Sequence, residues 1–337
     1  MGFPSITGHE FQKEFLMKSI KKQRVANSYL FYGPEGVGKK LVALEFAKLL
    51  NCERKIDGQG VYDEGKCTCS SCLKIDGSNH PDVTVLKSVD SSEIKVNQIR
   101  EQIEDLIYLK PYEGRYKISI IDDAESMNIN AQNAFLKTLE EPPADAVIIL
   151  VCSKPQYLLK TITSRCQSLE FFRLDESVII QAIKSKSQIS AEHYETAARL
   201  SQGSLSKALM MDEELLLERK SFIDNIANIQ NRSAVGILEL VEDISKEKSS
   251  DSNDYNVFFE TLFMWLKDIL YMKSNIDDKH IVHRDITEAT KRFAQIWSID
   301  YILELRSFLE KARESLFFRN VNKQFVLENV IIKFSKT

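Results

Sequence analysis

Short apolar runs alternate with helical patterns through the first half of the chain. The runs are β-branched and aromatic and are not interrupted by polar residues, as in strands that are buried on both faces. They predict strands at 28–33, 82–87, 116–122, 146–153 and 167–172. Apolar positions three and four residues apart predict helices over 39–50, 94–109 and 130–141, the last ended by two prolines. This alternation predicts an α/β domain with a parallel sheet.

The strand pattern stops after Phe172. Residues 175–212 are typical of short helices with a break at Gly203, and nearly everything from 214 onward is helical, apart from a polar stretch at 245–254 that predicts an exposed loop. The later helices are rich in aromatic residues, which indicates the core of a helix bundle. These aromatic residues are Phe258, Phe259, Phe263, Trp265, Phe308, Phe317, Phe318 and Phe325. The chain therefore divides into domains at 1–172, 173–213 and 214–337.

Composition restricts the class of protein. The chain has 337 residues, enough for two or three domains, with a hydrophobic share of 43% and a charged share of 28%, as in ordinary soluble proteins. The 45 basic and 49 acidic residues give a net charge of −4, which argues against extensive coating of nucleic acid. Neither a signal peptide nor a membrane span is evident. Six cysteines, four of them clustered between 52 and 72, favour a reducing compartment, so we expect a cytoplasmic protein.

The stretch "GPEGVGKK" (33–40) is typical of a phosphate-binding loop between a strand and a helix. Gly33, Gly36 and Gly38 would let backbone N–H groups approach a phosphate, and Lys39 would reach the outer phosphates. The next position normally carries a Ser or Thr that binds magnesium, but here it is Lys40. An ammonium ~4 Å from a divalent ion is repelled by roughly 8 kcal/mol at an effective dielectric constant of 20.

The strand at 116–122 ends in a second weakened element. Asp122 would face the metal, and the following Asp123 stands where a longer Glu would orient the attacking water. The alternative is a tight strand–helix turn without a ligand. The strand before the loop, the helix after it and the acidic strand end favour a site that holds ATP or ADP weakly, or not at all, without hydrolysis.

Three longer motifs carry a family resemblance. They are "ANSYLFYGPEGVGKK" (26–40), "IIDDAESMNINAQNAFLKTLEEPP" (120–143) and "TSRCQSLEF" (163–171), and a shorter match returns at 320–328. With them the chain resembles the clamp-loader branch of the AAA+ ATPases, most of all the delta-prime subunits of bacterial DNA polymerase III. The resemblance implies a P-loop domain, a small helical lid and a helical collar that holds a ring together.

The resemblance also implies a function. Subunits of this kind form a hetero-pentameric ring with delta and gamma/tau subunits, which opens a sliding clamp and places it on primer-template DNA during replication. As part of a polymerase complex, a delta-prime subunit often lacks ATPase activity but gives an arginine to a neighbour's ATP. Arg165 in the Ser-Arg-Cys triplet matches that arginine finger; a surface or domain-interface arginine is the alternative. A guanidinium at a γ-phosphate stabilises the charge that develops in phosphoryl transfer.

One departure supports a subunit that does not hydrolyse ATP. Hydrolysing relatives carry an arginine after a Gly-Ser pair in the lid, whereas this chain has Ser206 and Lys207 there. The alternative is an ATP-hydrolysing gamma/tau-type subunit, which would need the missing Ser/Thr, Glu and arginine.

Four cysteines, Cys52, Cys67, Cys69 and Cys72, offer a tetrahedral set of thiolates, typical of structural Zn²⁺. Related clamp-loader subunits have a four-cysteine zinc module at this place, with the last three cysteines spaced C-x2-C-x2-C. Here the spacing is C-x-C-x2-C, so either Cys67 binds with altered geometry or one thiol remains free. Reduced thiols without metal are the alternative.

The remaining candidates have plainer interpretations. His80, before a predicted strand, indicates packing or a turn, and Cys152 and Cys166 indicate buried apolar thiols. Basic residues crowd an early helix, where a solvated face is the usual explanation. They are Lys13, Lys18, Lys21, Lys22 and Arg24. If any of them contacts DNA, we expect phosphate contacts without base recognition.

Overall fold

The computed structural model describes residue 3 and residues 6–54, 67–88, 93–247, 252–318 and 321–335. The chain divides into two compact units. The first contains residues 1–185 and 201–208, and the second contains residues 186–200 and 209–337. The division into three domains at 172 and 213 stays a prediction.

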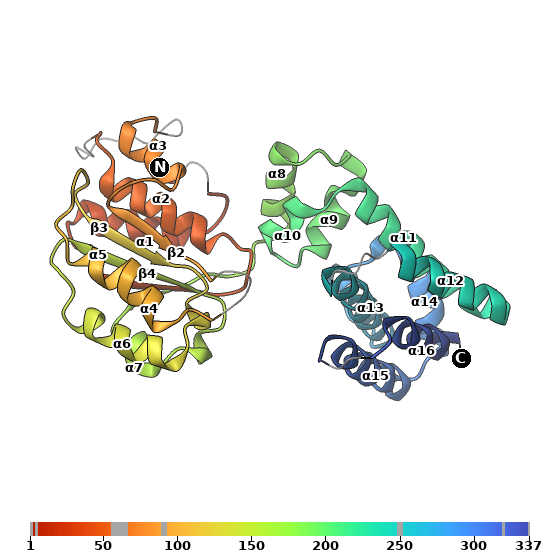
Figure 1. Cartoon of the computed structure of the whole chain (residues 1–337). Coiled ribbons are helices and arrows are strands. Elements are labelled where there is room, and N and C mark those ends of the chain that lie inside the picture. Colours follow the sequence, from red (N-terminus) through yellow and green to blue (C-terminus); the bar gives the residue numbers. More distant parts are fainter. Residues whose placement is uncertain are drawn as a thin grey trace. The chain divides into compact units, whose positions relative to one another are not determined.

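A five-stranded parallel sheet forms the centre of the first unit (Figure 1). Its strand order is β2-β3-β4-β1-β5, and β1 pairs with both β4 and β5, so that Leu30 lies opposite Leu150 and Ser168. The strands are β1 (Ser28–Tyr32), β2 (Val83–Leu86), β3 (Lys117–Ile121), β4 (Ala146–Cys152) and β5 (Gln167–Glu170). All five predicted strands and the parallel α/β fold are confirmed.

Alternate residues of the strands supply two apolar layers, one on each face of the sheet. On one face Phe31 packs with Leu16, from the helix that precedes β1, and with Phe46, from the helix that follows the phosphate loop. On the other, Leu30 packs with Ile103 and Phe135. Since neighbouring side chains of a strand point to opposite faces, helices must cover both sides, which explains why the strand sequences are continuously apolar.

The helices of the first unit precede, connect and follow the strands. They are α1 (Glu10–Lys21), α2 (Lys39–Asn51), α3 (Ser70–Asp76), α4 (Val96–Ile99), α5 (Asp105–Ile107), α6 (Ile129–Glu140), α7 (Lys160–Thr163), most of α8 (Glu176–Lys186) and most of α10 (Leu205–Met210). The helix predicted over 94–109 is not one regular α-helix, because a π-helical turn at Arg100–Glu104 separates α4 from α5. Short 3₁₀ turns occupy Ala124–Ser126 and Pro155–Tyr157.

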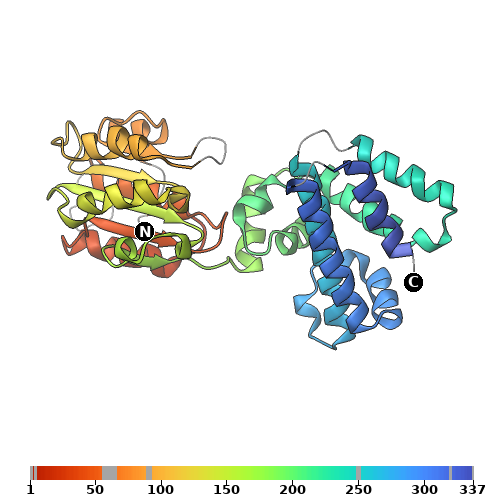
Figure 2. The same cartoon turned by 60° about the horizontal axis from the view of Figure 1, so that its bottom comes forward.

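Helices are the only regular secondary structure among the described residues of the second unit, as predicted. Its helices are α9 (Tyr194–Leu200), α11 (Glu213–Ala227), α12 (Ala234–Glu247), α13 (Ser252–Lys273), α14 (Thr287–Ile296), α15 (Ile299–Phe318) and α16 (Lys323–Ser335). Its 3₁₀ turns are at Ala191–His193, Ile229–Asn231, Asp278–His280 and Arg284–Ile286. Helix α15 packs against both α13 and α16 (Figures 1 and 2). Trp265, Phe293 and Trp297 are buried in the core, where the Phe293 ring contacts both tryptophan rings.

Two expectations for the helical region were wrong. The stretch 245–254 is not simply an exposed loop, because α12 continues to Glu247 and α13 begins at Ser252; residues 248–251 lie outside the described part. Phe325 is 60% exposed rather than buried, because it lies on the outer side of α16 while Leu327 is fully buried. The side chains of Phe317 and Phe318 lie outside the described part of the chain. Among the described residues no helix is both long and apolar enough to cross a membrane.

Candidate functional site

The predicted phosphate loop joins the end of β1 to the start of α2. A Cβ at Gly33 would lie 2.1 Å from the Phe171 carbonyl oxygen, so only glycine fits beside β5. Gly38 has a φ of +105°, and a Cβ there would meet nothing within 4 Å. The loop thus brings its backbone into a turn, with open space where α2 begins.

Lys39 is only 5% exposed, and its ammonium group is held by the loop. Its Nζ donates to the carbonyl oxygens of Gly33 and Pro34, each at 2.7 Å, and to Ser153 Oγ at 3.0 Å. Burial lowers the pKa of Lys39, and the nearby Glu125 carboxylate opposes this shift. All three acceptors are neutral, so a phosphate oxygen could replace them with a stronger, charge-assisted hydrogen bond.

Lys40 stands at the sequence position where a working P-loop carries the Ser or Thr that binds magnesium. Its Nζ is 3.0 Å from Oδ2 of Asp122, the residue that follows β3. The Asp122 backbone N–H donates to the Leu86 carbonyl oxygen, which fixes the carboxylate at the carboxyl edge of the sheet. Mg²⁺ requires oxygen ligands at about 2.0–2.1 Å. The Asp122 carboxylate is already paired with the Lys40 ammonium, and residue 40 offers no hydroxyl ligand. These two residues therefore do not fit a magnesium ion.

Asp123 has a left-handed backbone, with a φ of 52°, in the turn after β3. Burial raises the pKa of its carboxyl group, and the neighbouring Asp122 and Glu125 carboxylates raise it further. Glu125 Oε1 is itself engaged, since it accepts from the backbone N–H groups of Ser153 and Lys154 at 2.8 and 3.1 Å. The pattern of the sequence did not single out Ser153 or Glu125, although Ser153 directly follows a buried strand at this edge.

Residues 201–208, which belong to the first unit, pack against the phosphate loop. The Ser206 N–H donates to the Gly36 carbonyl oxygen at 2.9 Å, and a Cβ at Gly36 would lie 2.1 Å from Ser204 Oγ. Gly36, with a φ of +74°, therefore has to be a glycine for this segment to close. Ser206 and Lys207, at the place expected for an arginine, are thus beside the loop.

Arg165 is on the surface, two residues after α7. Its Nη2 is 2.7 Å from Glu140 Oε1, and its Nη1 donates to the Thr161 carbonyl oxygen at 3.0 Å. The two charged side chains are 36% and 50% exposed. Glu140 is the last residue of α6 and precedes the two prolines that end it. In the sequence, Glu140 is part of the motif at 120–143 but has no predicted role. Its contact with Arg165 joins residues 25 positions apart, which the sequence pattern does not reveal.

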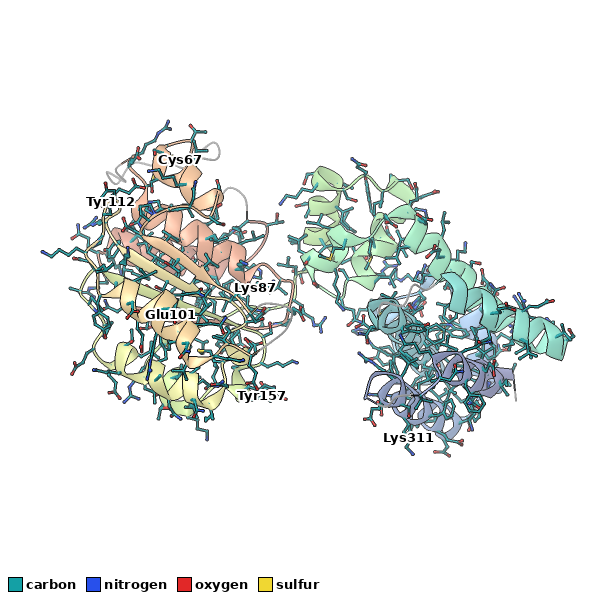
Figure 3. The ribbon with its side chains drawn as sticks, viewed as in Figure 1. Cys67, Lys87, Glu101, Tyr112, Tyr157 and Lys311 are labelled. Atoms are coloured by element: carbon teal, nitrogen blue, oxygen red, sulfur yellow. The ribbon has the colours of Figure 1, made fainter. Side chains whose placement is uncertain are left out.

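The four clustered cysteines come together near the amino ends of the strands, whereas the phosphate loop lies at their carboxyl ends. Figure 3 shows Cys67 near α3 and Tyr112, away from Lys87 and Tyr157, which follow β2 and β4. The four sulfur atoms lie within 4.8 Å of one another, with Cys52 Sγ 3.6 Å from Cys67 Sγ and 3.8 Å from Cys69 Sγ. All six cysteines of the chain are thiols outside disulfides.

The geometry of the thiols fits a tetrahedral metal ion such as zinc. Four sulfurs about 2.3 Å from a central ion are about 3.8 Å apart at tetrahedral angles. Burial acts to raise the pKa of Cys69, but hydrogen bonds from the backbone of Cys72 and Glu53 outweigh it, and the pKa is lowered to about 7. A readily formed thiolate is the form that binds metal. The short C-x-C spacing therefore does not keep Cys67 away from the set.

A buried polar network supports the cysteine cluster, and sequence patterns did not reveal it. Ser71 Oγ in α3 donates to the Asn51 carbonyl oxygen and contacts His80 Nε2 at 3.1 Å. Asp82, fully buried, accepts three backbone N–H groups from residues 112–114 and the Lys117 ammonium at 3.1 Å. His80 thus has the packing role expected of it. Cys152 is buried as expected, and burial together with the neighbouring Glu125 carboxylate raises its pKa to about 12. Cys166 is half-buried, and burial raises its pKa to about 12.

The basic residues of α1 are partly neutralised within the helix. Lys13 pairs with Glu10 at 2.7 Å and Lys18 with Glu14 at 2.6 Å. Lys21, Lys22 and Arg24 are exposed at its end. A contact of this helix with DNA stays a prediction.

Comparison with known proteins gives the family. Residues 8–175 match the family described as "DNA polymerase III, delta subunit", and residues 213–336 match "DNA polymerase III, delta subunit, C terminal". The Bacillus subtilis DNA polymerase III subunit delta' is 26% identical over 95% of this chain and 94% of its own length. The B. subtilis subunit tau is 25% identical over 99% of this chain, which spans 62% of the length of that relative.

A solved structure agrees with the fold. A DNA polymerase III gamma subunit-related protein of Thermotoga maritima superposes with a TM-score of 0.50 at 21% identity, over 96% of this chain and 98% of that one. Together with the sheet, the phosphate loop and the matched families at both ends, these relatives show that the chain belongs to the clamp-loader subunits of DNA polymerase III.

Proposed function

We propose that this chain is a delta-prime-like clamp-loader subunit that does not hydrolyse ATP itself. In this proposal it joins delta and gamma/tau subunits in a five-membered ring and helps place a sliding clamp on primed DNA. Its relatives named delta' and tau support the assignment to such a ring. Exposed apolar side chains on α12 and α16 of the helical unit, Val235, Leu238 and Phe325, suit contacts with other subunits.

The contact between Lys40 and Asp122 is the observation that carries this proposal. A hydrolysing site needs Mg²⁺ to neutralise the β- and γ-phosphates and a carboxylate to position the attacking water. Here the carboxylate that would face the metal is paired with an ammonium at 3.0 Å, and the next acid is the short Asp123. Two elements of hydrolysis are missing at once, while the loop itself is formed.

Arg165 is the group that would act on a neighbour. It is exposed, and its guanidinium is held by Glu140 and the Thr161 carbonyl oxygen. An ion pair between side chains this exposed is worth about 0–1 kcal/mol. The finger would therefore be kept in a defined orientation in the free chain, at little cost for its release to a γ-phosphate.

Zinc in the cysteine cluster would be structural in this proposal. Four thiolates leave no open coordination position for a substrate. The ion would hold α3 and the end of α2 together at the edge of the sheet opposite the phosphate loop.

An ATP-hydrolysing gamma/tau-type subunit is the second candidate, favoured by the match to subunit tau over nearly the whole chain. ATP turnover by the purified chain separates the two. We expect turnover at background, whereas a rate of about 1 per second or more, typical of working enzymes, would reject our proposal. Pull-down with gamma/tau subunits tests membership of the ring, and lack of association at micromolar concentration would contradict it.

A further inference from the structure

The Lys40 ammonium is paired with the carboxylate that would face the metal ion in a working P-loop. We propose that Lys40 takes the place of the divalent cation, so that this site binds a nucleoside polyphosphate in its metal-free form and is weakened by Mg²⁺. The inference deepens the proposed function, since it concerns the site that does not hydrolyse ATP. It predicts a dependence on magnesium opposite to that of a working P-loop.

Lys40 is in a position to serve both the carboxylate and a ligand. Its Nζ is 3.0 Å from Asp122 Oδ2, while its side chain is 38% exposed, against 11% for that of Asp122. An ammonium has three N–H donors, so contact with one carboxylate oxygen leaves donors for a phosphate. The Asp122 carboxylate is thereby paired without a metal, which weakens the repulsion it would exert on a polyphosphate, although the Asp123 and Glu125 carboxylates lie near it.

The rest of the cradle suits an unmetallated phosphate group. Lys39 adds a second ammonium, held by three neutral acceptors that a phosphate oxygen can replace. The space beside Gly38, where a Cβ would meet no atom within 4 Å, lies at the start of the 13-residue helix α2. A metal-free nucleotide carries two more negative charges than its magnesium complex. The Lys39 ammonium can compensate part of this charge, and Lys40, which is paired with Asp122, can add its remaining N–H donors.

Magnesium would act against this site in two ways. It binds the nucleotide in solution and so depletes the metal-free form that the site accepts. The complex it forms would also bring a divalent cation close to the Lys40 ammonium, which repels it. A Thr at position 40 would remove the ammonium, restore a hydroxyl ligand and release Asp122, so that the dependence on magnesium should invert.

Isothermal titration calorimetry of ADP and ATP into the full chain tests the proposal, in matched buffers containing either EDTA or excess MgCl₂. For the wild-type chain we expect binding about tenfold tighter in EDTA. The Lys40→Thr variant should show the opposite dependence and bind the nucleotides more tightly in MgCl₂ than in EDTA. Lys311→Thr, which removes the same charge from an exposed site on α15 (Figure 3), should behave as the wild type.

Circular dichroism checks that each variant is folded. Should Lys40→Thr not fold, Asp122→Asn gives a second test: it leaves the Lys40 ammonium in place, so binding in EDTA should persist and Mg²⁺ should still weaken it. Wild-type binding that is tighter in MgCl₂, or absent for both nucleotides at millimolar concentration in both buffers, would overturn the inference. Neither result would affect the role of Arg165, which acts on a neighbour's nucleotide and is tested separately.

Discussion

Replacing Arg165 by alanine should slow ATP hydrolysis in the assembled ring at one site, the one next to this subunit. An arginine finger is worth at least about 10³ in rate, or roughly 4 kcal/mol. Releasing the guanidinium from Glu140 costs up to about 1 kcal/mol, because both side chains are a third to a half exposed. The net contribution is about 3 kcal/mol, so hydrolysis at the adjacent site should slow about 200-fold.

Single-turnover hydrolysis by the ring reconstituted with its hydrolysing subunits is the appropriate assay, because steady-state rates average over several sites. The Arg165→Ala ring should assemble normally and show one slow phase with the amplitude of a single site. Glu140→Gln serves as the matched control: it removes the charge that holds the guanidinium, so the rate should stay unchanged or rise by up to about fivefold. Arg165→Lys should remain slow, since an ammonium lacks the planar fork. An unchanged time course for Arg165→Ala would refute the finger.

Three further predictions concern the scaffold. Asp82→Asn should lower the free energy of unfolding in urea by about 2–3 kcal/mol at pH 7. Burial acts to raise the pKa of Asp82, but the backbone N–H of Tyr112 and the other donors hold it at about 2. Because the pKa in the folded state is depressed, the difference between wild type and variant should vanish as the pH falls from about 4 to 2, and an equal difference at pH 2 would contradict this. Metal analysis of chain purified without chelator should give about one zinc per chain, lost in Cys72→Ser; zinc-free wild type would favour unligated thiols. Leu327→Ala should cost about 2–5 kcal/mol in thermal or urea unfolding and Phe325→Ala almost nothing, because only Leu327 is buried; equal losses would contradict the assigned faces of α16.

The sheet could be predicted from the sequence because its strands are buried on both faces. A run such as Ala146–Cys152, in which every residue is buried, has a pattern that few other structures share. The 245–254 stretch was harder, because its polar residues are compatible with exposed helix ends as well as with a loop. Phe325 was placed in the core by its residue type alone, whereas burial depends on which side of α16 faces the bundle.

The sequence singled out the candidate residues one by one, but it did not predict the contacts between them. Lys40 and Asp122 stood out separately as departures from a hydrolysing pattern, and the sequence contains no signal that they touch. The sequence likewise contains no signal for the contact between Arg165 and Glu140, or for the contact of Ser204 with the phosphate loop. These contacts join residues distant in sequence, and a pattern that reports periodicity within one element carries no information about them.

A structure of the assembled ring with a non-hydrolysable ATP analogue tests the central claim most directly. Our account predicts that the Arg165 guanidinium has left Glu140 and lies within hydrogen-bond distance of the γ-phosphate bound by the neighbouring subunit. An Arg165 that still pairs with Glu140, far from every bound nucleotide, would contradict the account.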